Sequence, residues 1–107
     1  MKRFGSVIGV RAEKLEEYKR LHAAAWPGVL KMIYDCNLRN YSIYYKDGLL
    51  FSYYEYVGED YAADMAKMAA DEETKRWWAL TAPCQCPLDT RAEGEWWAGM
   101  EEGFHCD

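Results

Sequence analysis

The chain has 107 residues and a formal net charge of −5, and its Lys and Arg residues are scattered. Binding to nucleic acid is not expected, because phosphate recognition depends on clustered cationic side chains. No apolar stretch reaches the length of a transmembrane helix, so no membrane span is expected. Half of the residues are hydrophobic and 16% are aromatic, which predicts either a core filled with rings or a pocket lined with them.

Residues 3–10 show the two-residue alternation of a β-strand. Two basic residues precede a short apolar run, charged residues resume at Arg11 and no cleavage site follows, so we interpret this stretch as a strand rather than a signal peptide. A cytoplasmic protein is therefore expected. The two faces of the strand would carry Phe4, Ser6, Ile8 and Val10, and Gly5, Val7 and Gly9.

Residues 12–24 change to helical spacing, and Trp26-Pro27 ends the helix because proline redirects the chain. Tyr18 and His22 lie four residues apart and so share one face of this helix. An imidazole titrates near neutral pH, which makes His22 the first candidate for acid–base chemistry. A half-buried structural histidine is the alternative interpretation.

A short second helix is expected to end near Asn37. Residues 39–46 and 49–57 then read as two strands joined by Asp47-Gly48, a strong signal for a two-residue hairpin. In the first of these strands Tyr41 and Ile43 share a face. The ring of Tyr41 could therefore reach a site beside the first helix.

Asp60 is expected to cap a further helix, and another helical segment runs from Asp71 to Pro83. Trp77 and Trp78 are neighbours in this segment and point about 100° apart. One should pack inward while the other faces a pocket or an interface. The residues numbered 83–99 look irregular, and 100–106 are expected to form a last strand.

The order strand, helix, strand, strand, helix, strand is that of a ferredoxin-like split βαβ, an α+β fold. The sequence contains no internal repeat or linker, so residues 1–107 are expected to form a single domain. One face of the sheet would pack on the helices, and the other would expose large aromatic side chains. A symmetric homodimer, sheet against sheet, is the simplest way to cover that second face.

The four cysteines are Cys36, Cys84, Cys86 and Cys106. Cys84 and Cys86 have C-x-C spacing rather than the C-x-x-C of zinc knuckles, and adding Cys106 and His105 gives no strong zinc pattern. Free thiols are therefore expected, with no metal and no disulfide. Glycine-rich phosphate loops, nucleophile elbows and zinc-protease motifs are absent.

Several short patterns, in order and with compatible spacing, extend along nearly the whole chain. They are Glu17-Tyr18-x3-His22-x3-Trp26-Pro27, Asn40-Tyr41-Ser42-Ile43-Tyr44, Leu50-Phe51, Arg76-Trp77-Trp78 and the ending Met100-Glu-Glu-Gly-Phe-His. As a set they resemble the L-rhamnose mutarotases. The resemblance implies a ferredoxin-like dimeric α/β barrel, a homodimer joined through its sheets, and no cofactor or metal.

The resemblance also implies an aldose 1-epimerase that interconverts the α and β anomers of L-rhamnose by ring opening and closure. Matched by position, His22 would be the proton donor, and Tyr18, Tyr41, Trp77 and Trp78 would contact the sugar. The side chains suit this chemistry. An imidazole can transfer a proton at neutral pH, and aromatic rings can cover the apolar face of a deoxy sugar.

Three positions depart from the family pattern. Ala23 and Ala24 stand where family members carry Asn and Pro, and Gly28 stands where they carry an acid. A related sugar such as L-fucose is therefore an alternative substrate. The fold by itself also allows a cofactor-free monooxygenase or dehydratase, and a non-catalytic small-molecule binding module would keep the aromatic pocket without using His22.

Overall fold

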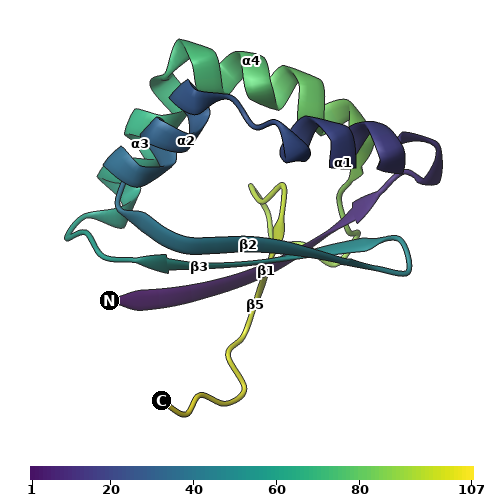
Figure 1. The fold of residues 1–107 in the computed structure, drawn as a ribbon. Coiled ribbons are helices and arrows are strands. Elements are labelled where there is room, and N and C mark those ends of the chain that lie inside the picture. Colours follow the sequence, from purple (N-terminus) through teal and green to yellow (C-terminus); the bar gives the residue numbers. More distant parts are fainter.

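The computed structural model describes residues 1–107, and Figure 1 shows the arrangement of its elements. Helices and strands alternate along the chain before a largely irregular C-terminal part. The elements are β1 (Lys2–Val10), η1 (Ala12–Lys14), α1 (Leu15–Ala23), α2 (Pro27–Asp35), β2 (Leu38–Lys46), β3 (Leu49–Tyr56), α3 (Tyr61–Ala70), α4 (Glu72–Thr81), η2 (Ala82–Cys84), β4 (Gln85–Cys86) and β5 (Ala98–Met100).

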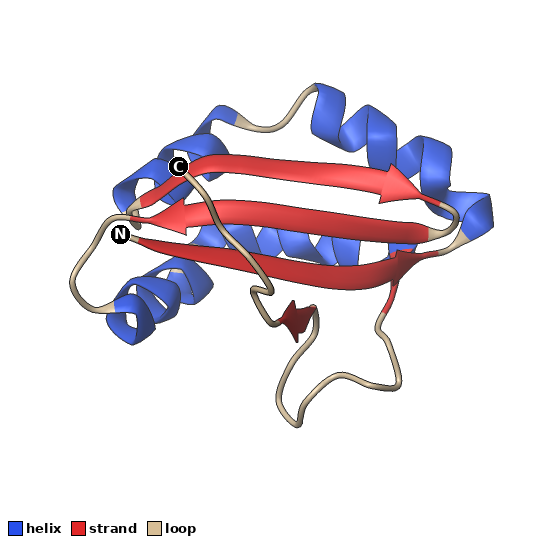
Figure 2. Ribbon diagram, turned by 90° about the horizontal axis from the view of Figure 1, so that it is seen from below, coloured by secondary structure: helices blue, strands red, loops and turns tan.

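One antiparallel sheet organises the molecule. Its strand order is β2-β3-β1-β4, and β5 also pairs with β1. The four α-helices lie together on one face of this sheet, while the opposite face carries no helix (Figures 1 and 2). None of the helices combines the length and the hydrophobicity that a membrane span needs.

The β2–β3 hairpin follows directly from its turn residues. Asp47 and Gly48 have φ angles of 49° and 80°, as a type I′ turn requires, because its twist matches that of the two strands. Helix starts also follow the sequence. Asp60 accepts a hydrogen bond from the Ala63 amide of α3, and Asp71 accepts one from the Thr74 amide of α4. The hairpin and the Asp60 cap predicted from the sequence are confirmed.

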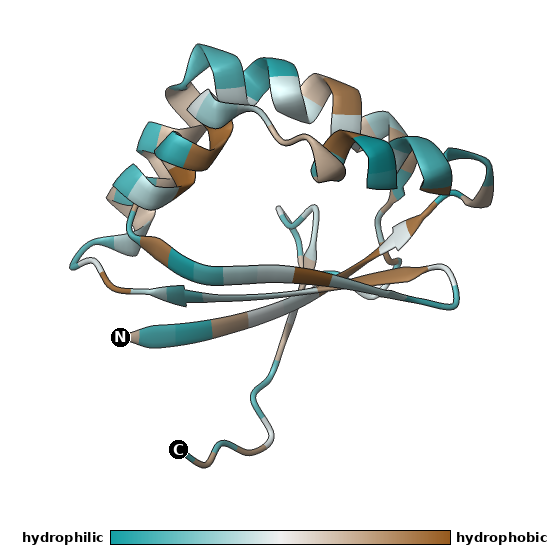
Figure 3. Cartoon of the chain, in the orientation of Figure 1, coloured by the Kyte–Doolittle hydropathy of each residue, from teal (hydrophilic) through white to brown (hydrophobic).

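The core lies between the sheet and the helices, as the alternation of β1 predicted. Ile8 and Val10 are buried against Tyr18 of α1 and Leu50 of β3. Colouring by hydropathy shows hydrophilic and hydrophobic stretches alternating along the helices, as expected for helices with one face on a sheet (Figure 3). A second cluster completes the core and comprises Cys36, Leu38, Tyr56 and Met68.

The other face of the sheet carries apolar side chains that the helices do not cover. Residues paired across antiparallel strands share a face, and Phe51 of β3 pairs with both Val7 and Tyr44. These three form the centre of the face opposite the helices, which we call the outer face. Tyr44 is 68% exposed there.

The prediction of a last strand over residues 100–106 is wrong. Strand β5 ends at Met100, and residues 101–107 form no regular structure and leave the sheet on its outer side (Figure 1). The pairing of β5 with β1 stops at Gly5. Beyond Gly5, a side-chain ion pair of 2.9 Å joins Arg3 to Glu102. No backbone pairing continues there, so residues 101–107 have no strand partner.

Candidate active site

A cavity of about 790 Å³ lies between the helices and the sheet. Its walls come from all four α-helices on one side, from β1, β2 and β3 on the other, and from the chain after α4. The structure brings all five side chains singled out from the sequence to this one cavity. They are Tyr18, His22, Tyr41, Trp77 and Trp78.

His22 is held by the helix that carries it. Its Nδ1 atom lies 2.9 Å from the carbonyl oxygen of Tyr18, one helical turn earlier. A carbonyl can only accept, so Nδ1 carries the hydrogen and Nε2 of the neutral imidazole carries the free lone pair. The ring stacks on that of Tyr18 at 4.2 Å and meets the edge of Trp77 at 5.1 Å. Its orientation is therefore fixed from three sides.

Burial lowers the pKa of His22 below its ordinary value of 6.5, and the hydrogen bond to the Tyr18 carbonyl only partly opposes this. Desolvation disfavours the charged imidazolium, while the carbonyl acceptor favours it. Near neutral pH the side chain is consequently a neutral base, with its lone pair on Nε2.

Tyr18 and Tyr41, two of the three tyrosines that line the cavity, are neutral phenols. Tyr18 is 4% exposed, and burial raises the pKa of its hydroxyl well above the ordinary range. Tyr41 is 40% exposed, yet desolvation of its hydroxyl raises the pKa to about 12, and Tyr61 adds to the shift. Both hydroxyls can therefore donate a hydrogen bond to a ligand throughout the neutral range.

A bulge in β2 precedes Tyr41. The register with β3 shifts between Arg39 and Ser42, and Asn40 has a φ angle of 51°. Asn tolerates this left-handed conformation, and its side chain donates a 2.7 Å hydrogen bond to Glu55. Bulges commonly redirect side chains next to functional sites. Tyr41 and Ile43 both line the cavity, so they share a face of β2 as the alternation predicted.

Trp77 and Trp78 differ in exposure, as their helical spacing predicted. Trp77 is 6% exposed, and its ring makes T-shaped contacts with the rings of His22 and Trp26, the latter at 5.3 Å between ring centres. Trp78 also lines the cavity but is 43% exposed. Trp77 therefore supports His22 from within the core, and Trp78 offers an aromatic surface to a ligand.

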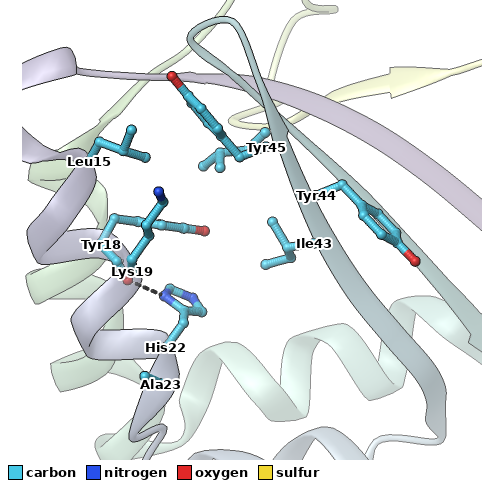
Figure 4. A pocket seen from close by; sticks show the side chains of 9 residues that line it. Leu15, Tyr18, Lys19, His22, Ala23, Ile43, Tyr44 and Tyr45 are labelled. Atoms are coloured by element: carbon cyan, nitrogen blue, oxygen red, sulfur yellow. Dashed lines mark hydrogen bonds between the residues drawn. The ribbon is translucent and has the colours of Figure 1, made fainter.

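His22 also borders a second, smaller hollow of about 310 Å³ between α1 and the β2–β3 hairpin (Figure 4). The two spaces share Tyr18, His22 and Ile43. In Figure 4 the imidazole of His22 lies across from Ile43, while Tyr44 points away from it. The side chain of His22 thus borders both spaces.

Trp96 and Gln85 also line the cavity, and sequence reasoning missed Gln85. Gln85 is 5% exposed, and its Oε1 accepts a 2.7 Å hydrogen bond from Nε1 of Trp96. Both belong to the stretch that looked irregular, where no periodicity marks a face. In the sequence, the adjacent Trp96 and Trp97 predict one ring packed inward and one facing a pocket or an interface, and they do not point to Gln85.

The thiols do not assemble a metal site. Cys36 and Cys84 are buried, Cys86 and Cys106 are exposed, and all four are free. No group of three or more His, Cys, Asp or Glu side chains lies close enough together to hold a metal ion. His105 instead contacts Asp107 at the C-terminal end.

Comparison with known proteins gives a consistent result. The family model for L-rhamnose mutarotase matches residues 3–106. The L-rhamnose mutarotase of Bacillus subtilis (strain 168) is 36% identical over 85 residues, which cover 78% of this chain and 79% of that protein. The L-rhamnose mutarotase of Lactiplantibacillus plantarum is 29% identical over 110 residues, covering both chains completely.

Two solved structures share the fold. L-rhamnose mutarotase FA22100 from Formosa agariphila superposes with a TM-score of 0.77 at 20% identity over the full length of both chains. Tetracenomycin F2 cyclase from Streptomyces glaucescens, a type-II polyketide cyclase, superposes with a TM-score of 0.75 at 10% identity, covering 100% of this chain and 98% of the cyclase. The predicted ferredoxin-like α+β class is confirmed. Since the family model spans nearly the whole sequence and relatives above 30% identity match most of it, the chain belongs to the L-rhamnose mutarotase family.

Proposed function

We propose that the protein is an L-rhamnose mutarotase, a cofactor-independent isomerase that interconverts the α and β anomers of L-rhamnose with His22 as its acid–base group. The observation that carries the proposal is the setting of His22. Its Nδ1 is bound to the Tyr18 carbonyl, its ring is packed between Tyr18 and Trp77, and the side chain lines the cavity. A neutral base in a cavity lined with aromatic rings suits a reaction that moves one proton on a sugar.

The reaction needs only a proton relay. Nε2 of His22 takes the proton of the anomeric hydroxyl while C1–O1 becomes a carbonyl and the C1–O5 bond breaks. The resulting imidazolium gives the proton to O5, which becomes a hydroxyl. Rotation about C1–C2 presents the other face of the aldehyde, and the same steps in reverse close the ring. O1 and O5 are both attached to C1, so one imidazole can serve both oxygens.

The aromatic side chains would position the sugar. Trp78 and the edge of Trp77 can cover its C–H face and methyl group, and the neutral hydroxyls of Tyr18 and Tyr41 can donate to its oxygens. When the anomeric carbon is held near the imidazole, the proton transfer takes place within one complex and needs no collision with a buffer base. The barrier in water is modest, so positioning and one acid–base group are sufficient.

The same proposal includes the setting in which the enzyme works. Residues 1–107 act as one domain in a homodimer that covers the outer face around Val7, Tyr44 and Phe51, in the cytoplasm, as part of rhamnose metabolism. The support for the dimer is the apolar centre of that face, with Tyr44 68% exposed. Nucleic acid and membranes are not among the proposed partners, in keeping with the net charge of −5.

The test is anomeric exchange of L-rhamnose, measured by magnetisation-transfer NMR with and without catalytic amounts of the protein. L-Fucose and D-glucose serve as comparison sugars. We expect faster exchange for L-rhamnose. Acceleration of L-fucose alone would keep the mechanism and change the substrate, whereas no acceleration for any sugar would refute the mutarotase and favour a binding module.

A further inference from the structure

Gln85 is a buried amide at the wall of the cavity. It is the first residue of β4, pairs with Val10 of β1, and follows directly after Cys84. Only 5% of its surface is exposed, and its side chain lines the 790 Å³ cavity. A polar side chain in this position is costly unless its hydrogen-bonding groups find partners.

One protein group binds the amide, and a second lies close to it. Its Oε1 accepts the 2.7 Å hydrogen bond from Nε1 of Trp96, and its side chain is near enough to the Tyr18 hydroxyl to oppose the rise in the pKa of that group. The amide therefore lies between α1 and the segment that precedes β5, and it is hydrogen-bonded to that segment. A primary amide has two N–H donors and two acceptor lone pairs, so its N–H groups and one lone pair remain for a ligand.

Four other polar side chains of the cavity have fewer free hydrogen-bonding groups for a ligand. Thr74 donates its only O–H to Asp71, and Thr81 directs its own to the carbonyl oxygen of Trp78. Ser6 and Ser52 bind each other, which uses one of their two O–H groups. Besides the hydroxyls of Tyr18 and Tyr41, Gln85 is thus a cavity group that can donate to one sugar hydroxyl and accept from it or from its neighbour at the same time.

We propose that Gln85 is a sugar-binding residue that contributes to specificity, with its free N–H and free lone pair receiving a hydroxyl of the monosaccharide. Trp96, held by the same amide, forms the adjoining wall. This inference rests on the proposed mutarotase function and extends its site to the segment after α4. The ligand group recognised is a hydroxyl, because a donor and an acceptor on one amide match the donor and acceptor character of an alcohol.

The experiment compares Gln85→Met and Gln85→Glu with Cys86→Ser, an exposed neighbour on β4 as the matched control. Met keeps the length of the side chain but removes every hydrogen bond. Glu keeps an acceptor for Trp96 and loses the N–H donors when ionised. We expect KM for L-rhamnose to rise about tenfold in Gln85→Met, as the loss of one hydrogen bond implies, while kcat changes much less and the control is unchanged.

A set of monodeoxy L-rhamnose analogues tests whether Gln85 contacts a sugar hydroxyl or only supports the structure of the site. The analogue that lacks the hydroxyl bound by Gln85 should bind the parent and Gln85→Met equally, whereas the other analogues should still distinguish them. An unchanged KM for L-rhamnose, or an equal loss for every analogue, would overturn the proposal and leave Gln85 a structural link to Trp96. Urea unfolding of each variant checks that the fold is intact. If Gln85→Met does not fold, the same comparison is made with Gln85→Glu.

Failure of this inference differs from failure of the proposed function. A parent protein that accelerates L-rhamnose exchange, with Gln85 variants identical to it, refutes only the role of Gln85. A parent protein that accelerates no sugar refutes the mutarotase. Titration with L-rhamnose followed by tryptophan fluorescence still compares parent and Gln85→Met in that case, and equal affinities would overturn the inference.

Discussion

Nδ1 of His22 and the carbonyl oxygen of Tyr18 lie 2.9 Å apart across one turn of α1. This contact uses the only N–H of the neutral imidazole, so the reactive nitrogen is Nε2. The ring cannot turn over without breaking the hydrogen bond and leaving its stack on Tyr18. The helix backbone therefore selects which nitrogen performs the chemistry.

Replacing His22 with alanine should remove most of the rate and leave sugar binding. A positioned acid–base group contributes about 100-fold to 10,000-fold, and the aromatic walls that hold the sugar remain. Anomeric exchange and a fluorescence titration with L-rhamnose measure the two properties separately. His105→Ala, which changes the other histidine, is the matched control and should match the parent. Equal exchange rates in His22→Ala and the parent would remove His22 from the mechanism.

The activity should fall on the acidic side of neutrality. Burial lowers the pKa of His22 below 6.5, and ring opening begins with the neutral base. The enzymatic part of kcat/KM should be flat from pH 6.5 upward and decline as the pH passes below the lowered pKa. A profile that rises toward acid, after subtraction of the uncatalysed rate, would show that the imidazolium acts first.

Stability should follow the same titration. The folded state loses the His22 proton at a lower pH than the unfolded state, so the unfolded chain binds more protons between the two pKa values. The free energy of unfolding should therefore rise with pH up to about 6.5. His22→Gln should lose this part of the pH dependence in urea unfolding. An unaltered slope would mean that another group is responsible.

The two neighbouring tryptophans should respond differently to alanine. Trp77 is 6% exposed and contacts His22 and Trp26, so Trp77→Ala should cost about 3–5 kcal/mol and lower kcat as His22 loses its support. Trp78 is 43% exposed, so Trp78→Ala should leave stability within about 1 kcal/mol and raise KM. Urea unfolding with steady-state exchange kinetics distinguishes them. Similar losses of stability would contradict this division.

A methyl group added at Gly9, which does not line the cavity, should disturb the site indirectly. A Cβ there would lie 2.6 Å from the backbone oxygen of Cys86, so β4 must move, and Gln85 with it. Gly9→Ala should cost about 1–3 kcal/mol and weaken sugar binding. At Gly103 an added Cβ meets no atom within 4 Å, and Gly103→Ala should be neutral in both measurements. A stable, fully active Gly9→Ala would contradict the placement of β4.

The proposed dimer can be tested at the centre of the outer face. Phe51 pairs there with Val7 and Tyr44, and Phe51→Lys would bury a charge if two sheets pack together. We expect light scattering to report twice the chain mass for the parent and one chain for the variant. Leu80→Lys, at an exposed position on α4, should stay dimeric. A monomeric parent would refute the dimer.

Patterns within a short stretch of sequence predicted most of the fold. The Asp47-Gly48 turn fixed the hairpin, alternation in β1 identified the buried face, and neighbouring positions on a helix separated Trp77 from Trp78. Each signal depends on a few residues that are close in the chain. The grouping of His22 with Trp77 came instead from the family resemblance.

The rest depends on contacts between distant residues. A strand of two residues such as β4 is too short to show a period, so neither it nor Gln85 could be recognised. The predicted strand after Met100 failed because strand formation needs a partner edge that sequence does not display. Similarly, the direction of the His22 pKa shift follows from burial, which no local pattern around His22 reports.

The cavity volume of about 790 Å³ lies toward the upper end of the range for small-molecule sites, about 300–1,000 Å³. His22 is immobilised, so the moving part of the proposed reaction is the substrate. An open-chain aldehyde must swing about C1–C2 before it recloses, and a cavity moulded on one ring form would trap the anomer that entered. Free space around the sugar is therefore required for turnover, because the open-chain form has to rotate before the ring closes again.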